Sequence, residues 1–402
     1  SDTDDTNITG AELVANPGPS FSNTTNWYLD ASNKDTGTIA TLAVSSGRLV
    51  FTHSNTADYW DGFGISFGSL VVGQKYVIAA DVHAGTNMNV LRISDTASQH
   101  DADIAGAGAT ASAGLHSITF TATATTMYLH WNGYVTTSTI TLNSVSVRLA
   151  DQDCSVNNNG LQVFGTVTKT AVATGAELVS YGGFSATNFL EQPYNSDLNW
   201  QNNDFSVYGW FKLNNNGTQQ TMMMLMQPDG EVDYLLIEQQ SNGDMRFQVD
   251  SQSGASVAYA TTLPTGVWLH YCGVNKDNDK TYLYINGEPT GLHNGQLHGT
   301  SDFDNTSAKL TIGRKSTASY NNASSTPFTG QMALWRISNT TPSAEQIKKM
   351  YNDEKKLFAT NAKCTLYGSS SAVTAVAYDD SNDILHAGTS AGRSEFVGLN
   401  RI

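Results

Sequence analysis

The feature that most constrains this chain is a series of short segments with alternating side-chain character between residues 205 and 337. In each segment apolar and polar side chains alternate, and Asn, Gly or Asp stands at its ends. A period of two is typical of half-buried strands, and these turn residues favour antiparallel connections. The segments are Phe205–Lys212, Gly266–Val274, Thr281–Gly287, Leu310–Arg314 and Phe328–Ile337. They predict an all-β fold, with two antiparallel sheets packed face to face.

The order and the amino-acid motifs of these segments resemble those of the laminin-G-like, concanavalin-A-like jelly rolls. The shared phrases include Phe-Ser-Val-x-x-Trp from Phe205, Gly-x-Trp-x-His from Gly266 and Tyr-x-Asn-Gly from Tyr284. A helix that begins Ser343-Ala-Glu-Gln-Ile follows them, as it does in that group. The resemblance implies a jelly roll over residues 160–342. It implies no particular activity, because function lies in sites added to a fold.

Residues 9–150 contain a second series of alternating runs, such as Leu115–Phe120 and Ile140–Val147, and predict a second jelly-roll sandwich in tandem with the first. Residues 1–8 are expected to form a disordered or linking tail, and residues 151–159 a polar linker. The opening phrase Glu12-Leu-Val-x-Asn and the closing strand resemble those of β-sandwich carbohydrate-binding modules. In that family a calcium ion often joins the two strands. The resemblance makes Glu12 a calcium candidate, although Asn143 or Ser144 replaces the closing Asp of the family.

Residues 343–402 predict one short helix and a small C-terminal meander of three strands. Pro342 marks the start of the helix, and Ile347, Met350 and Tyr351 form its apolar stripe. A small meander is marginally stable alone, so we expect it to pack on the sandwich or to meet copies of itself. This ending resembles the tails of tail-fibre and other virion proteins of marine bacteriophages. The resemblance implies an extracellular virion protein that forms a homo-oligomer, a trimer, through residues 343–402.

The amino-acid composition excludes several classes of partner and site. Only 14% of the residues are charged and the formal net charge is −15. A surface rich in Asn, Thr, Ser and Gly suits neutral polar partners such as glycans. Nucleic acid and anionic lipid would be repelled. No stretch approaches the ~20 apolar residues that span a bilayer, so no membrane insertion is expected. Three distant cysteines argue against a disulfide framework and a zinc site. The chain begins at Ser1 without a signal-peptide pattern, so we expect a processed or excised piece.

Exposed aromatic rings are the residues expected to contact sugars, because a flat ring covers the C–H face of a pyranose. In the first sandwich the candidates are Tyr59, Trp60, Trp131 and Tyr134. Trp131 stands inside an alternating strand, so a place in the core is the alternative for it. In the second sandwich, long loops over residues 292–304 and 316–326 are the expected binding face. The candidates there are His293, His298, Phe303 and Tyr320.

Acidic residues give two further hypotheses. Glu231, Asp233 and Glu238 approximate the carboxylate run of concanavalin-A-like glycoside hydrolases. The two glutamates, however, would lie about 23 Å apart along a strand, whereas glycosidases need roughly 5–9.5 Å. The sequence therefore predicts no enzyme. Asp229, Asp233, Asp277 and Asp279 lie in acidic loops and are candidates, with Glu12, for structural calcium. No other cofactor is expected.

The sequence is compatible with three functions. The sequence favours a non-catalytic phage virion or tail-fibre protein that binds host cell-surface polysaccharide through lectin-like sandwiches and contacts other virion proteins. A purely structural virion decoration or spacer is the alternative. A glycan depolymerase on the same fold is disfavoured because no paired carboxylates, catalytic triad or nucleotide loop stands out.

Overall fold

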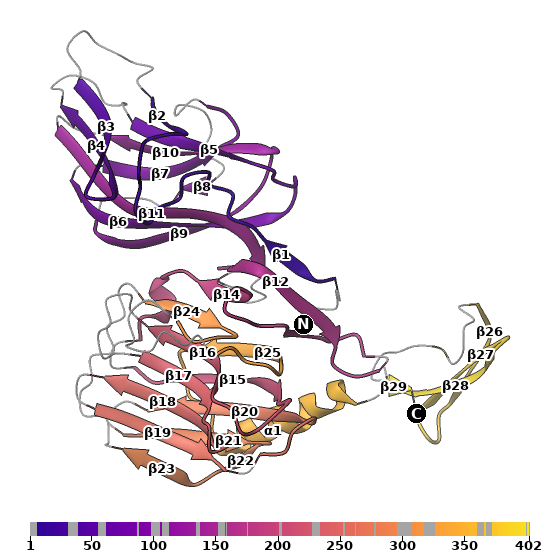
Figure 1. Cartoon of the computed structure of the whole chain (residues 1–402). Helices are drawn as coiled ribbons and strands as arrows, with labels where there is room; N and C mark the ends of the chain where they lie inside the picture. Colours follow the sequence, from indigo (N-terminus) through magenta and orange to yellow (C-terminus); the bar gives the residue numbers. More distant parts are fainter. Residues whose placement is uncertain are drawn as a thin grey trace.

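The structure is a computed structural model that describes the chain in segments. These are residues 6–30, 39–54, 62–86, 88–97, 105–106, 112–133, 137–151, 157, 159–174, 176–200, 203–226, 234–251, 254–261, 263–276, 279–295, 308–316, 326–359, 366, 372–398 and 400–401. The described residues form two β-sandwiches, one short helix and a small C-terminal sheet (Figure 1). The all-β prediction is confirmed. None of the described helices is long and apolar enough to cross a membrane.

The first sandwich consists of two antiparallel sheets. One contains β2 (Trp27–Asp30), β5 (Gly62–Gly68), β10 (Thr126–Gly133), β7 (Met88–Ser94) and β8 (Ala105–Gly106) in that spatial order. The other contains β3 (Ile39–Ser45), β4 (Arg48–Ser54), β11 (Thr137–Asp151), β6 (Lys75–Thr86) and β9 (Gly114–Thr121). Their inward side chains make one core, in which Trp131 stacks on Phe63 with ring centroids 5.1 Å apart.

The second sandwich is larger. We call its first sheet the broad sheet; it contains β12 (Leu161–Ala171), β14 (Phe189–Gln192), β24 (Lys309–Ile312), β16 (Gln220–Met226), β17 (Tyr234–Gln239), β18 (Met245–Ser251), β19 (Gly254–Ala260) and β23 (Leu292–Gly295). The opposite sheet contains β13 (Val179–Gly182), β25 (Gln331–Ser338), β15 (Phe205–Lys212), β20 (Trp268–Asn275), β21 (Thr281–Ile285) and β22 (Glu288–Pro289). A short 3₁₀ helix (Ser196–Leu198) precedes β15.

The two sandwiches are joined by strand pairing as well as by the chain. β1 (Ile8–Gly10) leaves the first sandwich and pairs with β12 of the second, with Ile8 opposite Val167. Gly10 is needed there, because a Cβ at this position would lie 2.0 Å from the carbonyl oxygen of Val163. The end of β11 also pairs with β12. Residues 1–8 were expected from the sequence to be a tail and residues 151–159 a linker, and this shared strand was not predicted.

Four side chains are stacked at the junction between the two sandwiches. The guanidinium carbon of Arg148 lies 4.0 Å from the ring centroid of Phe164, and Phe164 stacks on Phe189 at 4.3 Å. On the far side, the guanidinium carbon of Arg314 lies 3.8 Å from the centroid of Phe189. Both cations are partly desolvated, and burial lowers the pKa of each. The first sandwich is therefore held to the second through cation–π contacts as well as backbone hydrogen bonds.

Helix α1 (Ala344–Glu354) packs on the opposite sheet of the second sandwich and continues as a 3₁₀ turn (Lys355–Phe358). Ser343 and Gln346 form the capping box that starts the helix. At its other end, Glu354 accepts a 2.7 Å hydrogen bond from Nε1 of Trp210 and pairs with Arg336 at 2.6 Å. The predicted helix over 343–358 is thus present, with its last turn tightened.

The C-terminal sheet is a meander of β26 (Val373–Asp379), β27 (Ile384–Thr389), β28 (Gly392–Val397) and a two-residue β29 (Asn400–Arg401). Three of these were expected from the sequence. Figure 1 shows it, in yellow, apart from both sandwiches. β26 is an edge strand whose Val376 and Tyr378 are 65% and 55% exposed. Such an exposed apolar edge is a surface prone to pairing with another chain.

The buried His270 predicts a pH dependence of stability. It lies on β20 beside Trp210 and Tyr351, and neither of its ring nitrogens has a hydrogen-bond partner. Burial lowers its pKa to about 4; the nearby Glu354 opposes this shift and Arg336 adds to it. Because the unfolded chain takes up this proton near pH 6.5, the stability contributed by the neutral ring is complete above that pH. It is lost as the pH falls towards 4.

We therefore expect the free energy of unfolding to fall between pH 7 and pH 4 by up to about 3 kcal/mol more in the wild type than in His270→Phe. Urea unfolding followed by tryptophan fluorescence measures both slopes. His116→Phe, at a half-buried position of the first sandwich, is the matched control and should keep the wild-type slope. Equal slopes for His270→Phe and wild type would contradict the prediction.

Candidate functional site

The outer face of the broad sheet carries the candidate site. Successive side chains of a strand point to opposite faces of the sheet. Met223, Leu235 and Phe247 point into the core, so the residues before and after each of them point outward. The register then aligns Thr311, Met224, Leu236 and Gln248 in one row across β24, β16, β17 and β18. A second row contains Thr221, Glu238, Arg246 and Tyr259. We call these two rows, with Tyr234, Met226 and Asp250, the outer face.

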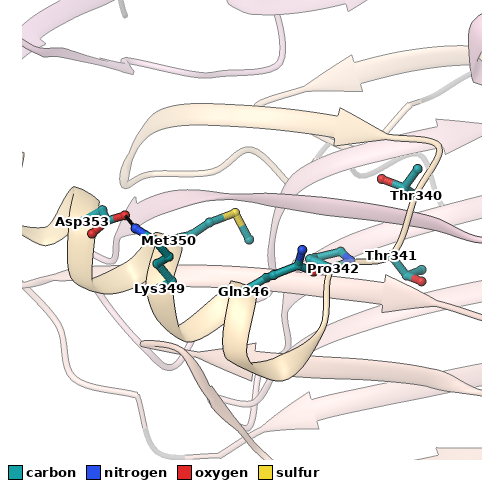
Figure 2. A pocket seen from close by; sticks show the side chains of 7 residues that line it. All are labelled: Thr340, Thr341, Pro342, Gln346, Lys349, Met350 and Asp353. Atoms are coloured by element: carbon teal, nitrogen blue, oxygen red, sulfur yellow. Dashed lines mark hydrogen bonds and ion pairs between the residues drawn. The ribbon is translucent and has the colours of Figure 1, made fainter.

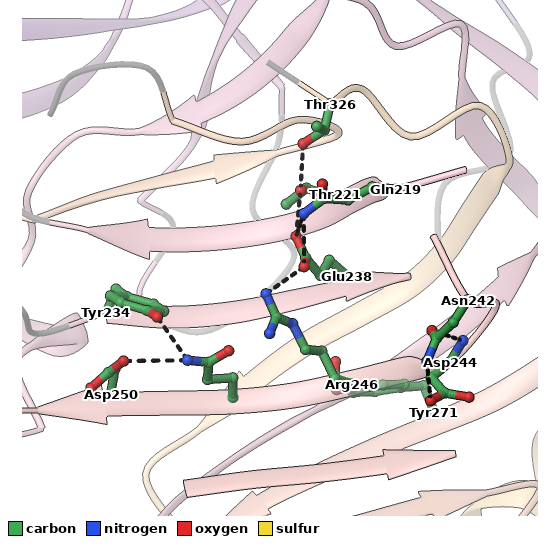
Figure 3. A network of polar contacts seen from close by, with 11 residues as sticks. Gln219, Thr221, Tyr234, Glu238, Asn242, Asp244, Arg246, Asp250, Tyr271 and Thr326 are labelled. Carbon is green, nitrogen blue, oxygen red and sulfur yellow. Dashed lines mark hydrogen bonds and ion pairs between the residues drawn. The ribbon is translucent and has the colours of Figure 1, made fainter. Parts of the chain in front are cut away.

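A charged pair lies at the centre of one row. Glu238 is fully buried and forms an ion pair with Arg246 on the neighbouring strand (Figure 3). Its carboxylate also accepts hydrogen bonds from Nε2 of Gln219 at 3.1 Å and from Oγ1 of Thr221 at 3.3 Å. Thr221 in turn contacts the hydroxyl of Thr326 at 2.9 Å. The network fixes the positions of the polar groups on this part of the sheet.

The other row combines apolar surface with polar atoms that the protein does not satisfy. Met224, Met226, Tyr234 and Leu236 form a buried apolar cluster separate from the main core. Beside it, Nε2 of Gln248 donates to the hydroxyl of Tyr234 at 2.7 Å and to Asp250 at 3.3 Å. Oε1 of Gln248, Oγ1 of Thr311 and Nε of Arg246 are all buried and have no hydrogen-bond partner in the part of the chain that the structure describes. A buried polar atom without a partner costs about 1–3 kcal/mol, so its retention needs a reason.

The carboxylates of the outer face are not arranged as a glycosidase pair. Glu238 lies opposite Arg246, whereas Asp250 lies four residues further along β18, at about 13 Å. Glycosidases hold their two carboxyl groups within roughly 5–9.5 Å. Glu238 is in addition neutralised by Arg246. What this face offers among the described residues is hydrogen-bonding groups beside apolar surface.

The one described aromatic candidate of the first sandwich is in the core. Trp131 has an exposed fraction of 0% and packs against Phe63 and Trp27. It cannot meet a sugar from solvent, so its assignment as a glycan-binding residue is wrong and the core alternative holds. The reason is parity, because Trp131 shares the inward face of β10 with Leu129.

Nine other candidates lie outside the described residues. They are Tyr59, Trp60, Tyr134, His298, Phe303 and Tyr320 among the glycan-binding candidates, and Asp229, Asp233 and Asp277 among the calcium candidates. His293 is described. It lies on β23 opposite Ala258, a core residue, and its Nε2 lies 3.0 Å from the buried Oγ of Ser256. Its parity therefore places it on the inward side of the broad sheet, away from the outer face.

The carboxylates of the two described calcium candidates, Glu12 and Asp279, accept hydrogen bonds from other groups of the protein. Glu12 does join the first segment to the last strand, but directly: its carboxylate accepts from the backbone N–H of Val147 at 2.9 Å and the hydroxyl of Ser146 at 2.6 Å. Arg148 lies 3.3 Å away. Asp279 accepts from the hydroxyl of Tyr282 at 2.7 Å. N–H and guanidinium groups disfavour a cation beside Glu12, and the described residues contain no cluster of three ligating side chains.

A separate pocket of about 490 Å³ lies at the start of helix α1 (Figure 2). Its lining combines hydroxyl groups, the amide of Gln346, the thioether of Met350 and the ion pair of Lys349 with Asp353. Several of these groups are engaged within the protein: Gln346 caps the helix and Thr341 donates to Asp204 at 3.1 Å. No sequence pattern indicated this pocket, because its two sides belong to a loop and a helix.

The central ion pair gives a stability prediction. Arg246→Met leaves the buried carboxylate of Glu238 without its cation, so we expect the free energy of unfolding to fall by about 3–5 kcal/mol. The double variant Glu238→Gln/Arg246→Met should regain most of this loss, because no buried charge remains. Urea denaturation of both variants and the wild type measures the difference. A double variant no more stable than Arg246→Met would contradict the assignment.

Comparison with known proteins agrees with this architecture. Residues 187–348 match the family described as the concanavalin A-like lectin/glucanases superfamily, a laminin-G-like group. No curated protein matches the chain. Domain 4 of the extracellular arabinanase AbnA of Geobacillus stearothermophilus, solved with arabinotriose, is similar at 18% identity over 49% of this chain and 91% of that chain, with a TM-score of 0.37.

Two further solved structures are similar to parts of the chain. The binding domain of botulinum neurotoxin serotype D has 14% identity, covers 61% of this chain and 70% of that chain, and gives a TM-score of 0.40. The carbohydrate-binding module of a Ruminococcus gnavus sialidase, bound to α2,3-sialyllactose, has 9% identity. It covers 40% of this chain and 92% of that chain, with a TM-score of 0.32. From the matched family and the observed sheets, residues 187–348 form a laminin-G-like, concanavalin A-like jelly roll.

Proposed function

We propose that this chain is a non-catalytic glycan-binding protein of a bacteriophage virion, part of a tail fibre or a similar appendage. In this proposal the outer face of the broad sheet contacts polysaccharide on the host surface. One observation carries it: at one end of this face, Tyr259 and Arg246 lie opposite each other and are only half-buried, and the exposed Leu292 is the other register neighbour of Tyr259. This combination matches the chemistry of a sugar.

A pyranose presents hydroxyl groups around its rim and C–H groups on its faces. Sugar hydroxyls can accept from the guanidinium of Arg246, and they can donate to or accept from the hydroxyl of Tyr259. The C–H faces suit the ring of Tyr259 and the side chain of Leu292. The weakly charged, Asn- and Thr-rich composition agrees with a neutral, hydroxyl-rich partner.

The absence of catalysis is part of the proposal. Among the described residues of the outer face, Glu238 is paired with Arg246 and lies too far from Asp250 for either glycosidase mechanism. A binding role needs no such pair. It needs fixed polar groups, which the network around Glu238 provides.

Attachment to a virion and assembly as a trimer rest on the resemblance of residues 343–402 to virion-protein tails. The exposed apolar edge strand β26 supports assembly, because Val376 and Tyr378 would lose water on contact with another copy. A small meander without contacts to a core is also stabilised by such contacts. Other virion proteins are the remaining partners in this proposal.

The variant Tyr259→Ala tests the binding site. Tyr259 is only half-buried, so its truncation should leave the protein folded. We expect the same change to weaken binding to host-cell polysaccharide about tenfold, the equivalent of about 1.4 kcal/mol. Calorimetry measures the affinity, and the wild type should release no reducing sugar during the same incubation. Unchanged affinity would reject the site, and time-dependent sugar release would reject the non-catalytic assignment.

The variant Val376→Asp tests assembly. Placing a charge on the apolar face of β26 should reduce the particle from a trimer to the 43.1 kDa single chain. Light scattering coupled to gel filtration measures the mass. Ala375→Asp, on the opposite face of the same strand, is the matched control and should stay trimeric. A wild-type protein that is monomeric at micromolar concentration would contradict the proposal.

A further inference from the structure

We infer that the first sandwich has a second, separate glycan site on the outer face of the β2–β5–β10–β7 sheet, centred on Tyr128. The inference rests on the proposed glycan-binding function and adds a location, a set of residues and a ligand class. The ligand is a short oligosaccharide of neutral pyranose rings. Trp131 does not contribute to this site, because it faces the core from the other side of β10.

The register brings the relevant side chains into one row. Tyr28 of β2 lies opposite Gly64 of β5, Gly64 lies opposite His130 of β10, and His130 lies opposite Arg92 of β7. Gly64 leaves room for the phenol of Tyr28 to lie across it. A Cβ there would come within 2.9 Å of the tyrosine oxygen and 2.5 Å of the carbonyl oxygen of Leu129.

A chain of hydrogen bonds fixes this row. The hydroxyl of Tyr28 lies 3.2 Å from Nδ1 of His130, and Nε2 of His130 lies 3.0 Å from Oγ of Ser94. Ser94 donates to the carbonyl oxygen of Thr96 at 2.7 Å, so its oxygen accepts from Nε2–H and Nδ1 accepts from Tyr28. His130 and Ser94 are both buried. The rings are thus held in place before any ligand arrives, which lowers the entropic cost of binding.

Tyr128 provides the surface on which a sugar can stack. It is the next outward residue of β10, is only half-buried, and its ring lies 16° from parallel with that of His130 at a centroid distance of 6.1 Å. Its register neighbours on both sides are serines, Ser66 and Ser94. Small neighbours leave the faces of the ring uncrowded, and the exposed Ser66 hydroxyl lies beside it.

The charges around this ring favour a neutral ligand. Arg92 is half-buried in the row of His130, while the exposed Asp95 follows Ser94 directly and accepts from Oγ1 of Thr123 at 3.1 Å. Because this part of the sheet carries one charge of each sign, no single sign is available for an ionic ligand to match. A neutral sugar is recognised by a flat ring that covers its C–H face and by hydroxyl groups that bind its own hydroxyls, and this surface offers both without a net charge.

Calorimetry on the full chain tests the inference, with laminarihexaose, mannohexaose and cellohexaose each used alone. We expect Tyr128→Ala to weaken binding of at least one of them about tenfold while Tyr128→Phe keeps wild-type affinity. Thermal melting should show that Tyr128→Ala stays folded. Tyr259→Ala, which alters only the second sandwich, should leave the Tyr128-dependent binding unchanged.

The outcomes separate the two sites. Loss of binding in Tyr128→Ala alone supports this site and rejects the one on the broad sheet for that sugar. Loss in Tyr259→Ala alone rejects this site and leaves the proposed function intact. Wild-type affinity in Tyr128→Ala for every sugar, or no binding of any sugar by the wild type, overturns the inference.

Discussion

Strand parity in the broad sheet is the constraint on which the candidate site depends. Met223, Leu235 and Phe247 are buried in the core between the two sheets, so the residues that alternate with them must face outward. Antiparallel register then places those outward residues in rows across four strands. A shift of one residue in any strand would exchange its core and outer side chains, so the packing of the core also fixes the site.

The outer face is unusual because it is buried and polar at once. A fully buried carboxylate such as Glu238 is tolerable only with a cation and further donors, and Arg246, Gln219 and Thr221 supply them. Buried atoms of Thr311 and Gln248 have no hydrogen-bond partner among the described residues, which lowers stability. Both side chains are buried, so a ligand can reach only the half-buried end of this face around Arg246 and Tyr259.

Much of the architecture could be predicted from sequence because it is local. Alternation and turn residues predicted the strands around Trp210 and Trp268, and Pro342 marked the start of the helix. Trp131 shows the limit of such reasoning, because an aromatic residue in an alternating strand faces either the core or the solvent. Tyr128, three residues earlier, faces the other way, and only the pairing of β10 with β5 separates the two.

The sequence by itself determined the all-β class, the helix and the weakly charged exterior, since each follows from local periodicity or composition. Tertiary structure alone decided which acids meet which cations, how β1 of one sandwich pairs with β12 of the other, and which polar atoms lack partners. These contacts join residues such as Ile8 and Val167, far apart along the chain. Their formation depends on sheet register and on the packing of two cores, which no local pattern encodes.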